Sequence, residues 1–176
     1  MTHTAVFIVG APAAGKTTLA RKLLGPLDRC TLIEKPKWTL SFDHVCAAGH
    51  YTGDTFDGAD RVGYNQVKPT LGYWQRELAG KARLTIFDGD RFSFESAIDF
   101  VAQFCSRVCC VYVLSEPAVL EARRAERGWA PNPRWLKGRQ TKARYFMGLF
   151  RERDRLFAGT AGVDEVTLNR FLVGAR

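Results

Sequence analysis

The segment richest in chemistry lies near the start of the chain, where glycine, lysine and threonine recur at a fixed spacing. It runs Gly10-Ala11-Pro12-Ala13-Ala14-Gly15-Lys16-Thr17-Thr18 and matches G-x-x-x-x-G-K-[ST], the pattern of a phosphate-binding loop. An apolar run precedes it and a helix-forming stretch follows it. A loop between a strand and a helix aims several backbone N–H groups and the positive helix end at one point, which favours a polyphosphate.

The pattern also assigns roles to two side chains. Lys16 is expected to neutralise the β- and γ-phosphates, and the Thr17 hydroxyl is expected to bind magnesium. We therefore predict a site for ATP and Mg²⁺, although the pattern alone does not distinguish ATP from GTP. The predicted cofactor-binding residues are Gly10, Ala13, Ala14, Gly15, Lys16, Thr17 and Thr18.

A second group of charged residues, Asp88-Gly89-Asp90-Arg91, follows the apolar run that ends at Phe87. Ligands of open α/β sheets bind beyond the carboxyl ends of the strands, so these residues are expected beside the phosphate loop. Asp88 is predicted to hold hydrated magnesium. Asp90 would orient or deprotonate an acceptor hydroxyl, and Arg91 would bind a phosphate. The alternative is a tight Asp-Gly turn with solvated acids.

The segment 41–65 lacks sustained periodicity and is rich in aromatic, acidic and glycine residues. A loop of this length in a compact domain is usually functional, so we predict a substrate-binding insert. Tyr51, Phe56 and Tyr64 are candidates for stacking on a planar base. Asp43, Asp57, Asp60 and Asp90 all remain candidates for the general base. The predicted substrate-binding residues are Tyr51, Phe56, Asp57, Asp60 and Arg91.

Positive charge is concentrated late in the chain. The formal net charge is +8, and residues 121–155 contribute +7 of it, with eleven Lys/Arg against four acids. This concentration indicates a polyanionic partner, or else a solvated helix face. The Gly- and Pro-containing break at 128–133 is flanked by arginines, so residues 123–139 are interpreted as a lid over the phosphates. Arg124 and Arg127 share a helix face and are its candidate catalytic residues.

Length and composition predict one α/β domain over residues 1–176. The chain is 46% hydrophobic and 25% charged, which is ordinary for a soluble protein. The first residues lack the features of a signal peptide and no run is long enough to span a membrane, so a cytoplasmic location is expected. The five cysteines form no C-x-x-C pair and are interpreted as buried free thiols. The strand candidates are 5–9, 31–34, 83–87, 108–114 and 163–168.

Helical spacing separates these runs. Apolar residues recur at helical intervals over 67–78, and Ser93 is positioned to cap a helix whose apolar face reaches Phe104. Pro117 opens a helix that reaches about residue 127. A long basic helix is predicted over 136–157. Alternation of strands and helices is typical of a layered α/β sheet.

The phosphate loop, the Asp-Arg pair at 90–91 and the arginine-rich lid together resemble nucleotide and nucleoside kinases of the P-loop class. This resemblance implies a three-layer sandwich with a five-stranded parallel sheet of order 2-3-1-4-5. It also implies transfer of the γ-phosphate of ATP to a hydroxyl acceptor. The D-G-[FY]-P-R stretch of adenylate kinase is absent from the chain.

Residues 49–60 are more similar to small bacteriophage kinases, some of which phosphorylate 5-hydroxymethyluracil within DNA during thymine hypermodification. The first hypothesis is therefore a kinase acting on phage DNA in the host cytoplasm, with DNA as partner. The second is a kinase of a free nucleoside, nucleoside monophosphate or other small hydroxyl compound. The third is a nucleotide-dependent switch or DNA-binding ATPase. No asparagine is followed by lysine, so the guanine-binding N-K-x-D motif is missing. The oligomeric state stays open.

Overall fold

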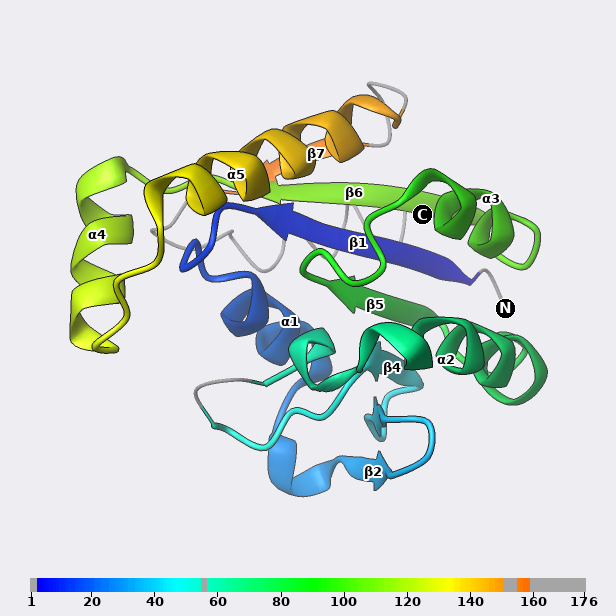
Figure 1. Ribbon diagram of the computed structural model, residues 1–176. Coiled ribbons are helices and arrows are strands. Elements are labelled where there is room, and N and C mark those ends of the chain that lie inside the picture. The colour runs from blue at the N-terminus through cyan, green and yellow to red at the C-terminus, as the bar shows by residue number, and fades with distance from the viewer. Residues whose placement is uncertain (1–2, 55–56, 151–154, 159–176) are drawn as a thin grey trace.

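The computed structural model describes residues 3–54, 57–150 and 155–158, which form a β-sheet with helices on both faces (Figure 1). Within this part of the chain seven strands stand in the order β2-β3-β4-β5-β1-β6-β7. The strands are β1 (Thr4–Gly10), β2 (Thr31–Ile33), β3 (Trp38–Leu40), β4 (Val45–Ala48), β5 (Leu84–Asp88), β6 (Arg107–Val113) and β7 (Arg155–Ala158).

The expected five-stranded parallel sheet is wrong in strand number and in direction at one edge. Strands β4, β5, β1, β6 and β7 are parallel, whereas β2 and β3 extend the β4 edge in antiparallel pairing. Counted along the chain, the five parallel strands are arranged 2-3-1-4-5. The second of them is β4, within the predicted insert, and the expected strand at 31–34 is the outermost strand β2.

Different helices cover the two faces of the sheet. Side chains of α2, α3 and α5 pack on one face around Phe7, Phe87 and Trp74. Side chains of α1 and α4 pack on the other face, around Val6, Ile8 and Val111. The helices are α1 (Lys16–Leu24), α2 (Val67–Tyr73) with its π-helical continuation η4 (Trp74–Leu78), α3 (Glu95–Ala102), α4 (Pro117–Glu126) and α5 (Pro133–Gly148).

Strand β1 lies at the centre of the molecule, between β5 and β6, and all seven of its residues are therefore buried. A strand covered on both faces reads as a continuous apolar run, as Ala5–Val9 does. Its side chains alternate between the two cores, so Phe7 contacts Phe87 and Phe146 on one face while Ile8 packs on the other. This central strand fixes the position of the loop that follows it.

Three expected elements differ in extent. Helix α5 ends at Gly148, and residues 155–157, predicted to be helical, belong to β7 (Arg155–Ala158) instead. The candidate strand at 163–168 lies outside the described residues. Ser93 does not cap α3, because Phe94 holds the N-cap position and the Ser93 hydroxyl donates to the Gly89 carbonyl at 2.7 Å.

No helix in the described ranges has both the length and the hydrophobicity that crossing a membrane requires. Each of the five cysteines is a free thiol, and Cys46, Cys109 and Cys110 are buried. Burial raises the pKa of Cys46 and of Cys110 to about 12.

A candidate phosphoryl-transfer site at the carboxyl edge of the sheet

The loop between β1 and α1 has the backbone conformation that its glycines predict. Gly10 has φ +150°, and a Cβ there would lie 2.6 Å from the Val113 carbonyl oxygen of neighbouring β6. Gly15, immediately before α1, has φ +100°. The Lys16 ammonium donates to the carbonyls of Gly10 at 3.2 Å and Ala11 at 2.9 Å. The loop therefore curls around its own lysine at the positive end of α1.

Thr17 and Asp88 meet at the base of this loop. The Thr17 hydroxyl donates to Asp88 Oδ2 at 3.0 Å, because the pairing of Ile8 with Asp88 in neighbouring strands aligns the ends of β1 and β5. Burial raises the pKa of Asp88, and hydrogen bonds from Tyr51, Ala59 and Thr17 oppose that rise. A hydroxyl and a carboxylate side by side are hard oxygen ligands, so the donor set fits Mg²⁺.

Lys16 faces two of the carboxylates of the site. Burial lowers the pKa of Lys16, while the negative charges of Asp88 and Asp60 act to raise it. A cation held near its own loop and balanced by acids is suited to exchange those contacts for phosphate oxygens.

Tyr51 is buried rather than open to a base. Its hydroxyl donates to Asp88 Oδ1 at 2.6 Å, and the Ala59 N–H donates to the same oxygen at 2.9 Å. Burial, followed by the charge of Asp88, raises the pKa of Tyr51. The predicted stacking role of Tyr51 is therefore wrong, and its hydroxyl orients the Asp88 carboxylate instead.

The acidic loop between β4 and α2 is held by Asp57. This carboxylate accepts from Arg21 at 2.5 Å and from the N–H groups of Thr52 and Gly53 at 2.8 and 2.7 Å. Burial raises the pKa of Asp57, but these hydrogen bonds outweigh it and leave the pKa below its ordinary value. Asp57 lines the cavity with its acceptor atoms already engaged, which indicates a structural role rather than the predicted contact with substrate.

Asp60 also lines the cavity, and it is exposed. Within the described residues its carboxylate has no hydrogen bond or ion pair, and its charge acts on Lys16, Tyr51 and Asp88. Asp60 is thus a free carboxylate next to the phosphate loop.

Beyond β5, Asp90 is surrounded by cations. Arg139 forms an ion pair with Asp90 Oδ2, and Lys142 donates to the Asp90 carbonyl at 3.0 Å. The Arg91 guanidinium lies over the Tyr64 ring, 3.7 Å from its centroid. Hydrogen bonding from Arg139 lowers the pKa of Tyr64, and burial lowers the pKa of Lys142. We call Arg91, Arg139 and Lys142 the basic cluster.

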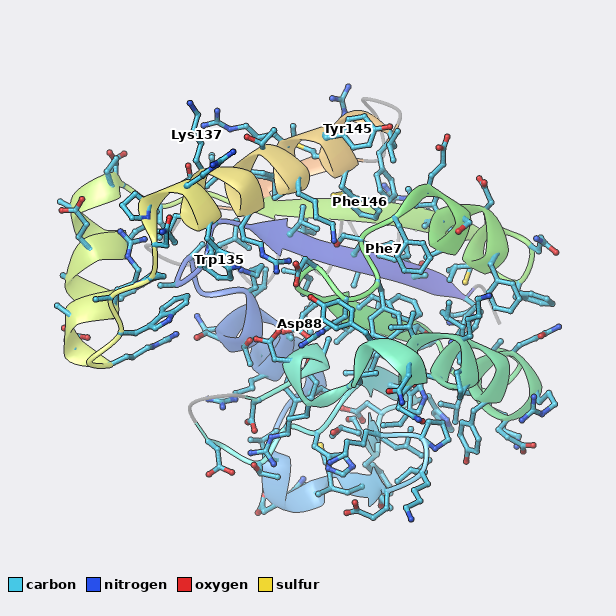
Figure 2. The ribbon with its side chains drawn as sticks, viewed as in Figure 1. Phe7, Asp88, Trp135, Lys137, Tyr145 and Phe146 are labelled. Carbon is cyan, nitrogen blue, oxygen red and sulfur yellow. The ribbon has the colours of Figure 1, made fainter. Side chains whose placement is uncertain are left out.

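The expected lid spans the end of α4 and the start of α5. Arg123 Nη1 donates to the Ala13 carbonyl at 3.3 Å, and Arg127 lines the cavity. Trp129 and Trp135 form a T-shaped pair with centroids 5.6 Å apart, and both line the cavity. Figure 2 shows Trp135 on the side of α5 toward the loop and Lys137 on the side away from it. Arg124, predicted to be catalytic, does not line the cavity, because Arg123 and Arg127 lie on that side.

All these elements enclose one cavity of about 510 Å³. The phosphate loop forms its floor, with Gly10, Ala13, Gly15, Lys16, Thr17 and Thr18 in its lining, while Ala14 is buried beneath. In Figure 1 the arrowheads of β1 and β5 point toward this edge of the sheet. The cavity contains Asp57, Asp60, Asp88, Asp90, Arg91 and Arg127 from the predicted site residues.

The remaining predicted residues are Asp43 and Phe56. Asp43 is in the turn before β4, where its carbonyl accepts from Arg83 at 2.7 Å, so it lies at the amino edge of the sheet and is excluded as a base. Phe56 lies outside the described residues.

Sequence reasoning missed several cavity residues, above all Trp135, Arg139 and Lys142. Their spacing of four and three places them on one face of α5, and this periodicity was the available signal. Trp129 and Asp54 carried no comparable signal, because the fold of the connecting loops positions them, and Arg21 lies on α1, four residues after Thr17.

No protein-family model matches the chain, and no curated protein matches it. Among solved structures, a sugar kinase from Janibacter sp. HTCC2649 is similar over 97% of this chain and 92% of its own, with 15% identity and a TM-score of 0.48. A gluconokinase from Sinorhizobium meliloti 1021 is similar over 97% and 90%, with 14% identity and a TM-score of 0.47. At these values the likeness assigns neither a family nor an activity to this chain.

Proposed function

We propose that this protein is a phosphotransferase that binds ATP with Mg²⁺ on the 10–17 loop and phosphorylates a hydroxyl group of a small acceptor. One observation carries the proposal. The Lys16–Thr17–Asp88 arrangement opens into a cavity that continues past β5 and contains a free carboxylate, Asp60. A site built for hydrolysis or switching needs the first part of this arrangement but not the second.

The residues of the chain divide the work of phosphoryl transfer. Lys16 and the loop N–H groups hold the polyphosphate, and Arg123 and Arg127 bring positive charge from α4. Magnesium held by Thr17 and Asp88 would neutralise charge on the phosphate oxygens. Trp129 and Trp135 narrow the cavity on the lid side and limit the entry of water.

Asp60 is the proposed general base. Asp57 is fully engaged with Arg21 and two N–H groups, and Asp88 with Tyr51, Ala59 and Thr17. Asp54 pairs with Arg61 and Asp90 pairs with Arg139. Asp60 is left to accept the proton of an acceptor hydroxyl beside the bound phosphates.

The acceptor in DNA remains a second candidate because of the basic stretch at 121–155. Arg134, Lys137 and Arg144 on α5 are exposed and do not line the cavity. These side chains are available for contacts with a phosphate backbone. A DNA base would have to enter the cavity flipped out or from a single strand. No described feature indicates a phage origin.

The test is transfer of labelled γ-phosphate to a panel of sugars, nucleosides, nucleoside monophosphates, plain DNA and DNA containing 5-hydroxymethyluracil. Labelling of small compounds supports the proposal. Labelling of DNA alone would show that the acceptor is DNA and not a small compound. Lys16→Ala is expected to reduce transfer by at least roughly 100-fold, because the positive charge that stabilises the transferring phosphoryl group is lost. Turnover retained in Lys16→Ala would overturn the assignment of the loop.

Asp60→Asn tests the base. We expect kcat to fall roughly 100-fold with the KM for ATP little changed, which is the usual contribution of a positioned base. Asp99→Asn, at an exposed position on α3 outside the cavity, is the matched control and should keep wild-type rates. Equal rates for Asp60→Asn and wild type would exclude Asp60 as the general base.

A further inference from the structure

The part of the cavity beyond β5 holds more positive charge than its own residues neutralise. Arg139 pairs with the Asp90 carboxylate directly, and Lys142 pairs with it more distantly, with Nζ 3.8 Å from Oδ2 and a hydrogen bond to the Asp90 carbonyl. Among the described residues Arg91 forms no ion pair with Asp90 or with another acid. One carboxylate therefore balances three cations.

Arg91 shows the imbalance most clearly. Its guanidinium stacks on Tyr64, and its Nε and Nη1 atoms are shielded from solvent without a hydrogen-bond partner among the described residues. Guanidinium N–H groups that are both desolvated and unpaired are unfavourable, so such a group is normally satisfied by an anion. Arg91 lines the cavity, so an anion within the cavity can reach it.

The order of the strands places Arg91 on the opposite side of β1 from the cations proposed to serve the nucleotide. Arg123 and Arg127 follow β6, on one side of β1 and its loop. Asp90 and Arg91 follow β5, on the other side of β1, where the segment after β4 also contributes Asp60 and Tyr64. Arg139 and Lys142 come from α5, after β6, but both contact Asp90, so the basic cluster gathers around Asp90 in the acceptor half of the cavity.

We propose that the acceptor carries an anionic group, a carboxylate or a phosphate, that binds to the basic cluster while its hydroxyl lies near Asp60. This proposal rests on the proposed function, of which it specifies the substrate class. Arg91 supplies unpaired N–H donors at Nε and Nη1, which suits hydrogen bonds to the oxygens of a carboxylate or phosphate. Lys142 adds a point charge, and Asp90 keeps Arg139 in place.

The experiment compares acceptors that differ in one anionic group. D-Glucose is compared with D-gluconate and with glucose 6-phosphate, and thymidine with thymidine 5′-monophosphate, in transfer of labelled γ-phosphate. We expect the anionic member of at least one pair to have the higher kcat/KM, and the carboxylate and phosphate arms identify which anion is bound. Arg91→Met should raise the KM for that acceptor roughly 10- to 100-fold, as expected for lost charge-assisted hydrogen bonds. The KM for ATP should stay unchanged.

Arg76→Met is the control, because Arg76 is exposed on η4 and does not line the cavity. Equal use of neutral and anionic acceptors would overturn the proposal while leaving the kinase assignment intact. A rise in the KM for ATP in Arg91→Met that matches the rise for the acceptor would also overturn it, because the cluster would then serve the nucleotide.

A second readout does not need phosphoryl transfer. Calorimetric titration of the wild-type protein loaded with Mg²⁺ and ADP, using the same compounds, measures acceptor binding alone. Binding of an anionic compound that Arg91→Met weakens would support the anion site even if no acceptor were phosphorylated. If no anionic compound binds more tightly than its neutral counterpart in any pair, the anion site is excluded.

Discussion

At the scale of single residues, the site depends on carboxylates that differ in how fully they are bound. Asp88 and Asp57 are buried and engaged by several donors, whereas Asp60 is exposed and has no such partner in the described part of the chain. Buried carboxylates with several donors are fixed in place and suit metal binding or loop anchoring. A carboxylate without donors keeps its basicity available for a substrate proton.

Asp57 gives a prediction with a defined pH dependence. Its pKa in the folded protein lies below its ordinary value of 3.8, so its stabilising contribution is complete above that pH and is lost as the pH falls through the lowered pKa. Asp57→Asn should reduce the free energy of unfolding by about 2 kcal/mol near neutral pH, because Arg21 loses its partner. Urea unfolding at pH 6 and pH 3 should give a smaller difference from wild type at pH 3.

Asp28→Asn, at an exposed position outside the cavity, should show no measurable difference at either pH. A destabilisation by Asp57→Asn that stays constant between pH 6 and pH 3 would contradict the lowered pKa.

The residues that sequence alone could identify are those fixed by local pattern. Lys16 and Thr17 lie within a contiguous motif, and Asp88 ends a recognisable strand. The choice between Asp43 and Asp60 could not be made, because it depends on where β4 lies between them. Tyr51 was misplaced for a related reason, since an aromatic residue in a loop gives no local sign that its hydroxyl is buried.

At the scale of elements, the acceptor loop is closed at its base by close backbone contact. The Gly58 N–H donates to the His50 carbonyl at 2.7 Å, and these two residues form an isolated antiparallel bridge. Gly49 has φ +98°, and a Cβ there would collide with the Gly58 carbonyl group. Gly53 has a similar φ of +97° but open space around it.

Alanine substitutions at Gly53 and Gly49 distinguish the cost of a strained backbone from the cost of a steric clash. Gly53→Ala should cost about 1 kcal/mol of unfolding free energy, for the left-handed backbone alone. Gly49→Ala should cost more than about 3 kcal/mol, because the bridge must also open. Chemical denaturation of both variants measures the difference, and equal losses would show that the bridge does not close the loop.

Strands were predictable where burial was continuous and long. Strand β1 and β5 were expected within one or two residues because each is an apolar run at the centre of the sheet. Strand β4 was missed because it has only four residues, Val45–Ala48, and is followed directly by a loop rich in glycine and acids. The strand at 31–34 was expected to lie next to the strand at 83–87, whereas β3 and β4 separate β2 from β5, because a short apolar run gives no sign of its neighbours.

At the scale of the whole molecule, nucleotide binding should stabilise the fold, because the cavity joins elements from both helical layers to the sheet edge. Mg²⁺ and ADP at 100 times the dissociation constant should add about 2.7 kcal/mol to the free energy of unfolding. This corresponds to a rise of roughly 5–10 °C in Tm for a chain of this size. Thermal unfolding followed by circular dichroism measures it.

Lys16→Ala should show little of this rise, while its Tm without nucleotide should stay close to that of the wild type. An equal rise in both proteins would place the bound nucleotide outside the 10–17 loop.

The position of β1 between β5 and β6 has a consequence for how this scaffold can change. In the proposed function, Arg123 and Arg127, after β6, serve the donor, whereas Asp60 and the basic cluster, drawn from the segments after β4 and β5 and from α5, serve the compound being modified. Replacing the segment after β4 and the cavity face of α5 should therefore redirect selectivity while leaving the 10–17 loop and Asp88 untouched. Engineering a new product from this protein should begin with those two segments.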